Sequence, residues 1–412
     1  MGLDDLIAHQ RMTRQALLEK QRRDLAGIIE FAKNNTDYYR DRFAGLDEQP
    51  PEALPILRKE DVVANLDALL ARGAQETRGD AAKLGYTGGS TGKPMAFWYN
   101  EAKHALMRAG MARSYMMSGW RPGQRIVNFW GARRDIGAGG VFDNTDTEHT
   151  LPAQEYDEAT LDGWAHFVRS YRPVLLQGYA SILAELARFV IDNRIEMPDT
   201  LIGIYSTAEV LDERQRELME RAFSCPVFNQ YGSREIPNIA CECRHGGMHV
   251  FTDMVFLESH AVRGEDRLLV TSLTNRLMPM IRYDIGDSVR LKEGLGEVPC
   301  PCGSPFPLME MGLCRKNDFI RSPGGRRVHP SYFNRLLYGM TQIRQYQWIQ
   351  DAPDRIVLNV VAAPGLSPEI VDSLRESIRR DVDARMTLEF NPVEEIARTV
   401  SGKHRFVISH LA

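Results

Sequence analysis

The segment that carries the most information about the fold is residues 86–94, Tyr86-Thr87-Gly88-Gly89-Ser90-Thr91-Gly92-Lys93-Pro94. Its glycines let the backbone turn tightly and bring N–H groups against an anion. Its hydroxyls and its ammonium add further contacts to phosphate oxygens. A Walker A loop would need glycine at position 87 and serine or threonine at position 94, followed by a helix. Here the segment is followed by the strand-like MAFWY. We therefore expect a phosphate-binding loop of another kind, and the alternative is a flexible hairpin turn.

Four further motifs follow this loop along the chain. They are YGSRE at 231–235, RYDIGD at 282–287, CRKND at 314–318 and SGKHR at 401–405. Together with the loop, and in the expected order, they resemble the motifs of the adenylate-forming enzymes. This superfamily comprises acyl-CoA synthetases, luciferases and peptide-synthetase adenylation domains. Arg234 stands where the family motif usually has threonine.

Other segments narrow the resemblance to a subgroup. NNTDYYRDRF at 34–43, LPILRKEDV at 54–62 and QGYAS at 177–181, in a chain of 412 residues, resemble phenylacetate-CoA ligases and the related capsule-biosynthesis-type proteins. Some members of that group pair a cysteine and a histidine after the YGxxE motif with a later CPCG, and this chain has CPCG at 300–303. The resemblance covers residues 25–412.

The resemblance implies a reaction in two halves. A carboxylate attacks the α-phosphate of ATP to give an acyl-adenylate and pyrophosphate, and the thiol of CoA then displaces AMP. As in phosphoryl transfer generally, the first half needs positioning and charge neutralisation. The implied ATP- and AMP-binding residues are Thr87, Gly88, Gly89, Ser90, Thr91, Gly92, Lys93, Tyr231, Gly232, Ser233, Asp287, Arg315 and Glu209.

Several of these residues receive individual roles from the resemblance. Ser90, Thr91 and Lys93 would cradle the β- and γ-phosphates. Tyr231 would stack on adenine. Glu235 would hold Mg²⁺, because this ion favours a carboxylate together with phosphate oxygens.

The remaining roles concern the ribose and the reacting groups. Asp287 would accept hydrogen bonds from the ribose hydroxyls, with Arg315 assisting. Glu209 either faces the nucleotide or packs structurally. Lys403 would bridge the charge that develops on the α-phosphate and the carboxylate. The implied catalytic residues are Lys403, Glu235 and Lys93.

The hydrophobic pattern predicts an α/β fold. Strand-like and helix-like segments alternate through the middle of the chain, which argues for a parallel, doubly wound sheet. The expected strands are 125–130, 173–177, 201–205 and 226–230, with helices over 14–33, 59–71, 159–171, 180–193 and 212–223. Antiparallel strands are expected over 248–259 and 265–272. Beyond residue 315 we expect strands over 343–350, 355–362 and 386–390 and a helix that Ser367 caps.

Two domains follow from this pattern and from the motif order. Residues 1–315 would form the large adenylating domain of mixed sheets with helices, and residues 318–412 a small mobile α+β lid. The lid carries Lys403, so it must close over the site for adenylation and then rotate for thioester formation. The hinge would be Asn317, where the family commonly has aspartate or lysine.

The acid pocket is expected between the helix after Gln177 and the strand that ends at residue 205. Aromatic side chains there suit an aryl or other flat acid, although each taken singly is as consistent with ordinary core packing. The candidates are Trp130, Tyr179, Tyr205, Ser206 and Ala208. Weak candidates for CoA binding are Arg321, Arg326 and Arg327.

The cysteines predict a zinc site. Six cysteines in 412 residues are too few for a disulfide scaffold, and four of them fall in the segments CECRHGGMH and CPCG. Cys243, His249, Cys300 and Cys302 would give a closed Cys₃His shell, which indicates a structural metal. Cys241 or His245 are alternates for one ligand, and free buried thiols are the competing interpretation.

Composition sets the outer limits. The chain has 51 basic and 55 acidic residues, a net charge of −4, and 43% hydrophobic residues, which excludes a disordered chain and argues against a dedicated nucleic-acid binder. No stretch approaches the ~20 apolar residues that a membrane helix needs. We therefore expect a cytoplasmic enzyme whose partners are small molecules, with neither nucleic acid nor membrane, and with a homodimer as a candidate assembly.

The acceptor of the acyl group stays open at this stage. One alternative keeps the adenylation but transfers the acyl group to an amine or a carrier protein. Another is a weakly catalytic scaffold that retains the fold as a binding module. The intact Lys93, Glu235, Asp287 and Lys403 argue against the scaffold.

Overall fold

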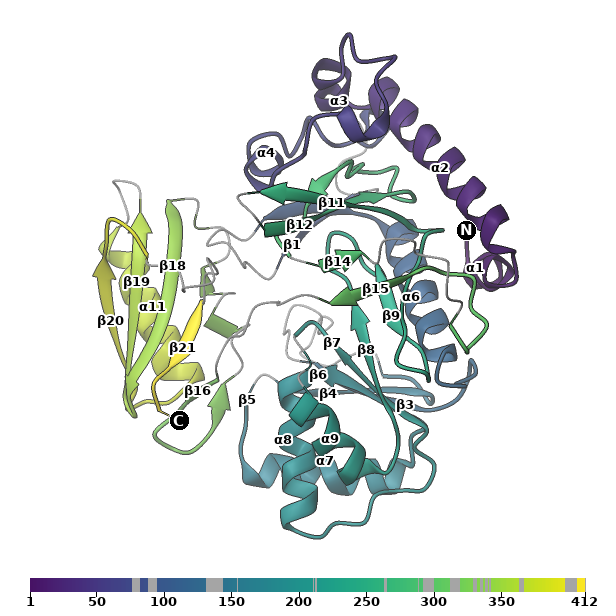
Figure 1. Cartoon of the computed structure of the whole chain (residues 1–412). Coiled ribbons are helices and arrows are strands. Elements are labelled where there is room, and N and C mark those ends of the chain that lie inside the picture. The colour runs from purple at the N-terminus through teal and green to yellow at the C-terminus, as the bar shows by residue number, and fades with distance from the viewer. Residues whose placement is uncertain are drawn as a thin grey trace. The chain divides into compact units, whose positions relative to one another are not determined.

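The computed structural model of the chain forms two compact units (Figure 1). Unit 1 comprises residues 1–87, 95–122 and 228–314, and unit 2 comprises 88–94, 123–227 and 315–412. The residues that the structure describes are 1–75, 82–87, 95–130, 144–153, 155–209, 211, 213–262, 265–287, 289–291, 300–311, 319–328, 332–333, 336–337, 340, 342–362, 367–396 and 406–411.

Unit 1 combines a helical N-terminal region with three antiparallel groups of strands. Its helices are α1 (Leu3–Gln10), α2 (Arg14–Asn35), α3 (Asp37–Arg42), the 3₁₀ turn η1 (Pro51–Ala53), α4 (Lys59–Ala64), α5 (Arg72–Gln75) and α6 (Glu101–Met116). Its strands are β1 (Lys83–Tyr86), β2 (Ala96–Tyr99), β8 (Val227–Tyr231), β9 (Ala240–Glu242), β10 (Met248–Val250), β11 (Val255–Val262), β12 (Glu265–Ser272), β13 (Tyr283–Asp284), β14 (Val289–Leu291) and β15 (Leu308–Met311).

These strands pair in the orders β1-β2, β11-β12-β13 and β8-β9-β10-β15-β14. Every pairing is antiparallel. In the last group, Cys241 on β9 pairs with His249 on β10. The same group carries the YGSRE motif at the end of β8, so the sheet organises both the nucleotide motif and the cysteine-rich segment.

Helix α2 shows why the N-terminal region folds onto this unit. Thr13 caps the helix by accepting a hydrogen bond from the backbone N–H of Ala16 at 3.2 Å. The Gln21 amide donates to the backbone oxygen of Val255 at 2.8 Å and so ties the helix to β11. The buried side chains recur at helical spacing along one face: Leu17, Gln21, Leu25, Ile28 and Ala32.

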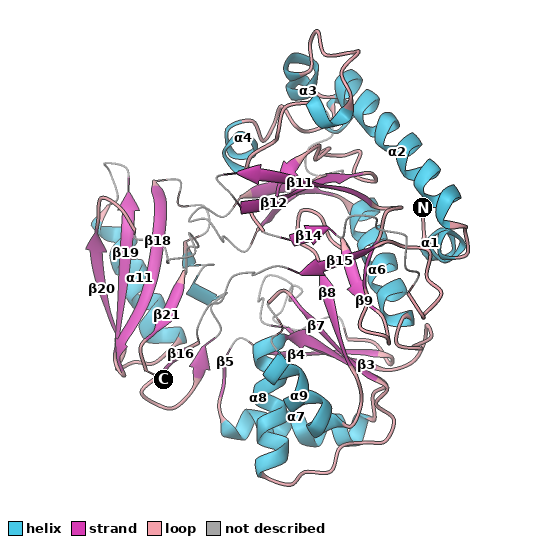
Figure 2. Ribbon diagram, viewed as in Figure 1, coloured by secondary structure: helices cyan, strands magenta, loops and turns pink. Residues whose placement is uncertain are grey.

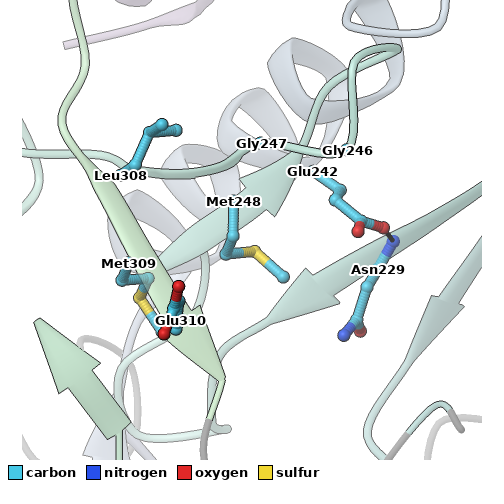
Figure 3. A pocket seen from close by; sticks show the side chains of 8 residues that line it. All are labelled: Asn229, Glu242, Gly246, Gly247, Met248, Leu308, Met309 and Glu310. Carbon is cyan, nitrogen blue, oxygen red and sulfur yellow. Dashed lines mark hydrogen bonds between the residues drawn. The ribbon is translucent and has the colours of Figure 1, made fainter. Parts of the chain in front are cut away.

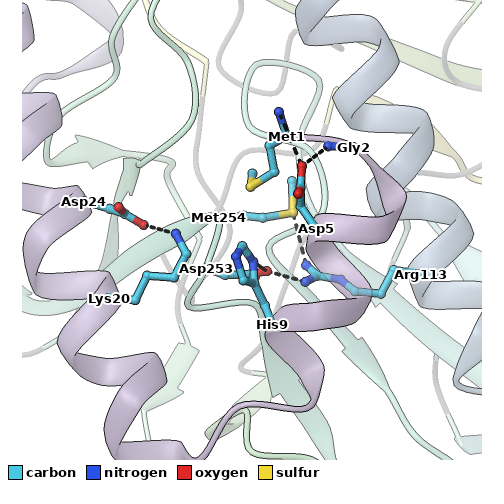
Figure 4. Close-up of polar contacts among 9 residues, drawn as sticks. All are labelled: Met1, Gly2, Asp5, His9, Lys20, Asp24, Arg113, Asp253 and Met254. Carbon is cyan, nitrogen blue, oxygen red and sulfur yellow. Dashed lines mark hydrogen bonds and ion pairs between the residues drawn. The ribbon is translucent and has the colours of Figure 1, made fainter.

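A buried ion pair fastens helix α1 to the rest of unit 1 (Figure 4). Arg113 and Asp253 are both fully buried, with 2.5 Å between Nη1 and Oδ2, and the His9 ring nitrogen Nδ1 lies 2.9 Å from the same oxygen. The Arg113 guanidinium also lies over the ring of Phe251 at 4.0 Å. Burial raises the pKa of Asp253, but Arg113 and His9 outweigh burial and hold it below its usual value.

Unit 2 begins with a parallel sheet in the order β7-β6-β3-β4. The strands are β3 (Ile126–Trp130), β4 (Glu148–Pro152), β6 (Leu175–Tyr179) and β7 (Gly203–Thr207), with β5 (Glu155–Tyr156) outside this sheet. The helices α7 (Glu158–Tyr171), α8 (Ala180–Asp192) and α9 (Glu213–Phe223) gather beside it (Figure 2). Their apolar faces share one core with Val127, Phe129, Leu176 and Ile204 of the strands.

The C-terminal part of unit 2 is a second α+β layer. Its sheet has the order β20-β19-β18-β21, and helix α11 (Pro368–Asp381) contributes Leu374 and Ile378 to its core. The strands are β18 (Ile343–Ala352), β19 (Arg355–Ala362), β20 (Thr387–Pro392) and β21 (Val407–Ser409). The short strands β16 (Ile320–Arg321) and β17 (Arg327–Val328) form a sheet with β5, in the order β16-β17-β5.

Most of the expected elements are confirmed within two residues of their predicted bounds. Two differ. The helix expected over 59–71 ends at Ala64, where the Asn65 amide donates to the Asp61 carbonyl. The strand expected over 248–259 is broken between β10 and β11, since the backbone turns at 251–254 and carries Asp253 to Arg113. Among the described helices, none is long and apolar enough to cross a bilayer.

Candidate functional site

The stem of the predicted phosphate loop is the β1–β2 hairpin. Beyond the last pair of the ladder, Thr87 N–H donates to the Met95 carbonyl at 2.9 Å, and Met95 N–H donates to Thr87 Oγ1 at 3.1 Å. The buried Thr87 thus closes the stem with both its backbone and its side chain. The loop residues Gly88, Gly89, Ser90, Thr91, Gly92 and Lys93 lie outside the described residues.

Two of the sequence motifs meet at the end of β8. The Tyr231 hydroxyl lies 3.0 Å from Asp287 Oδ2 and donates to it. The turn that follows is fixed by its own residues. A side chain at Gly232 would lie 2.8 Å from the backbone nitrogen of Asn238, so only glycine fits there. Ser233 Oγ accepts from the backbone N–H of Ile236 at 3.0 Å.

Both the side chain and the backbone carbonyl of Glu235 accept hydrogen bonds. Its side chain is 5% exposed, and Oε1 accepts a hydrogen bond from the Tyr283 hydroxyl at 3.2 Å. Its backbone carbonyl accepts from Lys103 Nζ at 2.9 Å. Burial lowers the pKa of Lys103 to about 8, although the negative charge of Glu235 acts to raise it. A carboxylate has about four acceptor positions, so the Tyr283 contact leaves Glu235 capacity for a cation.

Sequence reasoning missed both partners of Glu235. Tyr283 lies inside the RYDIGD motif, so the motif resemblance could have predicted that it lies near the YGSRE turn. Lys103 had none, because a lysine in the first turn of a helix is typical of a solvated surface.

In unit 2 the candidate pocket residues divide between the two faces of the parallel sheet. Trp130 and Tyr179 stack, with ring centroids 4.8 Å apart and planes 15° apart. Side chains alternate along a strand, so Tyr205 and Ser206 point to opposite faces. Ser206 pairs with Gly178, where an added side chain would meet Leu183 of α8 at 3.3 Å. Ser206 therefore faces the helical core.

Among the residues that the structure describes, none forms a hydrogen bond with the buried Ser206 Oγ on that core face. Ala208 follows β7 with a positive φ of 65° and is exposed. Glu209 accepts hydrogen bonds from the backbone N–H and the hydroxyl of Ser181, in the first turn of α8. The carboxylate thus satisfies a backbone donor that the helix leaves free, and this contact favours the structural interpretation of Glu209.

The C-terminal candidates are only partly described. Arg315, Asn317 and Lys403 lie outside the described residues. Of the basic residues considered for CoA, Arg326 donates to the backbone oxygen of Val382, and Arg327 forms an ion pair with Glu185. Arg321 is exposed.

The four residues predicted to bind zinc lie together in unit 1. The ligand atoms of Cys243, His249, Cys300 and Cys302 all lie within 4.8 Å of one another. The sulfurs of Cys243 and Cys300 are 3.6 Å apart, and the Cys302 sulfur is 3.2 Å from His249 Nε2. With Zn–S bonds of about 2.3 Å, tetrahedral ligands lie roughly 3.5–3.8 Å apart, so the cluster fits that ion.

Two similar turns build the cluster. In each, the backbone N–H of a glycine donates to the carbonyl of the cysteine three residues before it, Gly246 to Cys243 and Gly303 to Cys300, both at 2.9 Å. Both glycines have positive φ, 72° and 76°. The carbonyl of Phe306 lies 2.9 Å from His249 Nδ1, so this nitrogen carries the proton and Nε2 stays free for a metal.

The alternate ligands lie elsewhere. Cys241 is fully buried and hydrogen-bonds with Ser114 of α6, and burial raises its pKa. His245 is exposed. Burial opposes ionisation of Cys243, but its interaction with the His249 side chain and hydrogen bonds with the backbone of His245 and Gly247 outweigh burial and lower the pKa of this thiol to about 6. A thiol that ionises readily suits a metal ligand.

A pocket of about 430 Å³ opens beside the cluster (Figure 3). The Glu242 carboxylate is held there by the backbone N–H of Asn229 at 2.8 Å. Asn229 lies two residues before Tyr231 on β8, so both side chains point to the same face of the sheet. The described part of the lining has two carboxylates and no basic side chain: Asn229, Glu242, Gly246, Gly247, Met248, Leu308, Met309 and Glu310.

Comparisons with known proteins agree with the motif resemblance. Residues 320–410 match the CapK C-terminal domain family. The chain is 25% identical to protein CapK of Staphylococcus aureus, over 96% of this chain and 90% of that protein. It is 24% identical to a phenylacetate-coenzyme A ligase of Thermus thermophilus, over 97% and 98% of the two chains.

The solved structures give the fold. A 2-hydroxyisobutyryl-CoA ligase, determined in complex with 2-HIB-AMP and CoA, superposes with a TM-score of 0.58 at 18% identity. The superposition covers 97% of this chain and 91% of that ligase. The predicted fold class, a large mixed α/β body followed by a C-terminal domain, is confirmed.

Proposed function

As a distant homologue of CapK and of phenylacetate-CoA ligases in the adenylate-forming ligase superfamily, this chain is, we propose, an ATP-dependent acid–thiol ligase. It activates a carboxylic acid as an acyl-adenylate and then forms a thioester with CoA. The observation that carries the proposal is the contact of Tyr231 with Asp287 and of Glu235 with Tyr283. These contacts span 56 and 48 residues of sequence and join two motifs into one site.

The first half-reaction breaks the bond between the α- and β-phosphates. A carboxylate oxygen of the substrate attacks the α-phosphorus, and pyrophosphate leaves. Asp287 binds the ribose hydroxyls and is oriented by Tyr231, while Lys93 and Lys403 neutralise phosphate charge. Mg²⁺ at Glu235 would supply further neutralisation of the phosphate oxygens.

In the second half-reaction the CoA sulfur attacks the acyl carbon and AMP leaves with the bonding electrons. The proposed division at residues 315–318 serves this exchange. A lid of residues 318–412 carries Lys403 and turns about Asn317, and the match of residues 320–410 to a separate family of C-terminal domains supports this division. The stacked Trp130 and Tyr179 favour a flat, aromatic acid.

We assign the cysteine cluster a structural zinc ion. All four ligands come from the protein, so no coordination position is left for a substrate. The cluster links the turn after β9 to the turn before β15 and closes a loop of about 60 residues across unit 1.

Pyrophosphate release tests the adenylation directly. A panel of aliphatic, hydroxylated and aryl acids is offered with ATP and Mg²⁺, with and without CoA, and products are identified by mass spectrometry. We expect one acid class to give pyrophosphate and, with CoA, a thioester. Lys403→Ala should abolish the signal, and unchanged pyrophosphate release in this variant would sink the assignment of that lysine.

A second acceptor has one observation in its favour. The pocket of Figure 3 presents Glu242 and Glu310 on a sheet that also carries Tyr231, and two carboxylates suit an acceptor amine with a second, charged ammonium group. The same assay, repeated with diamines and amino acids in place of CoA, separates the two: formation of an amide rather than a thioester would favour the amine.

A further inference from the structure

Lys103 occupies a position that is unfavourable for its charge. It is the third residue of α6, where its backbone N–H is capped by Asn100 Oδ1 at 3.0 Å. The N-terminus of a helix carries partial positive charge, so a cation in the first turn is disfavoured. The side chain is also partly buried. A surface lysine would turn away into water, whereas this one turns inward.

The inward ammonium joins two parts of the proposed ATP site. Nζ donates to the backbone carbonyl of Glu235 at 2.9 Å and lies 4.7 Å from the ring centroid of Phe97. Glu235 belongs to the turn after β8, and Phe97 belongs to β2, one strand of the hairpin that residues 88–94 connect. A single cation therefore contacts both the proposed Mg²⁺ ligand and the stem of the phosphate loop.

A second chain of contacts runs from Met95, the residue just before β2, to the carboxylate itself. The Tyr283 hydroxyl donates to Glu235 Oε1 at 3.2 Å and lies 3.6 Å from the sulfur of Met95. The backbone of Glu235 is thus fixed by Lys103 and its carboxylate by Tyr283, and both supports stand next to the hairpin stem. Such outer contacts orient a metal ligand and tune its affinity.

We propose that Lys103 is a positioning residue for Mg²⁺·ATP, which sets the place of Glu235 relative to the phosphate-loop hairpin through its contacts with the Glu235 carbonyl and Phe97. This inference rests on the proposed function. Lys103 acts through its contact with the Glu235 carbonyl and not through the nucleotide. A neutral donor would satisfy the carbonyl alone, but only a cation also binds the face of Phe97 and offsets the charge of the neighbouring carboxylate.

Three substitutions separate these contributions. Lys103→Met removes the donor and the charge, Lys103→Gln keeps a donor without charge, and Lys103→Arg keeps both. Lys83→Met is the matched control, because Lys83 is an exposed lysine on the same hairpin. Thermal melting without nucleotide reports any purely structural cost of each variant.

The first measurement is binding of a fluorescent ATP analogue as Mg²⁺ is titrated, and it needs no acid substrate. For Lys103→Met we expect the Mg²⁺ concentration at half-saturation to rise about 10-fold or more, the usual range for loss of an outer-shell contact. Lys103→Gln should lie between Lys103→Met and wild type. Lys103→Arg should stay within about threefold of wild type because arginine keeps a donor and a cation that binds an aromatic face. The exposed Lys83→Met control should stay in the same range.

The second measurement is pyrophosphate release, in which the KM for ATP should rise in Lys103→Met while kcat at saturating Mg²⁺·ATP changes little. Folded Met and Gln variants with wild-type Mg²⁺ half-saturation would overturn the inference. If Lys103→Met does not fold, the Gln and Arg variants decide it by the same criterion. A wild type that binds Mg²⁺·ATP but activates no acid contradicts the proposed function and leaves the binding comparison valid for Lys103.

Discussion

Gly247 lies where the cluster of Cys243, His249, Cys300 and Cys302 leaves no room for a side chain. A Cβ there would stand 3.0 Å from a Leu308 methyl carbon, 3.2 Å from the Cys300 sulfur and 3.5 Å from the Cys243 sulfur. We expect Gly247→Ala to push the two thiolates out of tetrahedral geometry and to weaken zinc binding about 10-fold or more. Zinc retained during competition with a chromogenic chelator measures this. Gly246→Ala is not a clean control, because the positive φ of Gly246 would strain any side chain there. The control is Gly163→Ala on α7, where an added Cβ has no described atom within 4 Å.

Asp253 provides a test of pH dependence at a single residue. It is fully buried against Arg113, and loss of one partner of a buried pair costs about 3–5 kcal/mol. Because its pKa is lowered in the folded state, its contribution is complete above the unfolded pKa of about 4 and is lost as pH falls through the folded value. Asp253→Asn should therefore lower the free energy of unfolding at pH 7, with a smaller difference below pH 4.

Urea unfolding at both pH values measures this difference. The control is Asp24→Asn, which breaks the more exposed pair with Lys20 on α2 and should cost less than about 1 kcal/mol. If the two variants lose the same free energy of unfolding at pH 7, the ion pair of Asp253 with Arg113 does not stabilise the fold as a buried pair.

At the scale of one element, helix α8 depends on a side chain from outside it. Glu209 accepts hydrogen bonds from the backbone N–H and hydroxyl of Ser181 in the first turn of the helix. The side chain of the N-cap residue, Tyr179, makes no capping hydrogen bond. We expect Glu209→Ala to lower the free energy of unfolding by about 1 kcal/mol, the usual cost of a lost cap, and to leave the KM for ATP within twofold. Chemical denaturation and pyrophosphate kinetics measure the two quantities. Glu196→Ala, at an exposed site, is the control, and a large rise in KM would return Glu209 to the nucleotide site.

The elements also show what the sequence could and could not predict. The strands and helices around Val127 and Leu176 were predictable because their hydrophobic runs are local. The proximity of Cys243, His249, Cys300 and Cys302 was predictable because the cysteines lie in two short cysteine–glycine segments. The contact of Tyr231 with Asp287 joins the end of β8 to a residue that lies 56 positions later, beyond β13 of another sheet, so only the motif resemblance could suggest it. Tyr205 and Ser206 were both candidates for the acid pocket, but the alternation of side chains along a strand already predicts that they point to opposite faces of the sheet. Lys103 had no local signal.

At the scale of the whole molecule, the proposed zinc ion would stabilise one part of the chain more than another, because its ligands lie close together. All four ligands belong to unit 1. The apolar core around Trp348 and Leu358 in the C-terminal part of unit 2 contains none of them. Because a metal that binds only the folded state stabilises what it binds, zinc should support unit 1 selectively.

Removal of zinc with a strong chelator should therefore act on one part of the chain. We expect hydrogen exchange to speed up in β9, β10 and β15, which the ligand turns join, while the amides of β18 and β19 keep their protection. Added zinc should reverse the change, and added Mg²⁺ should not, because thiolates select zinc. Uniform loss of protection in both regions would mean that the two parts unfold as one cooperative unit. Exchange that is unchanged everywhere would mean that the four side chains hold no stabilising ion, since a closed Cys₃His shell contributes its binding free energy to the fold.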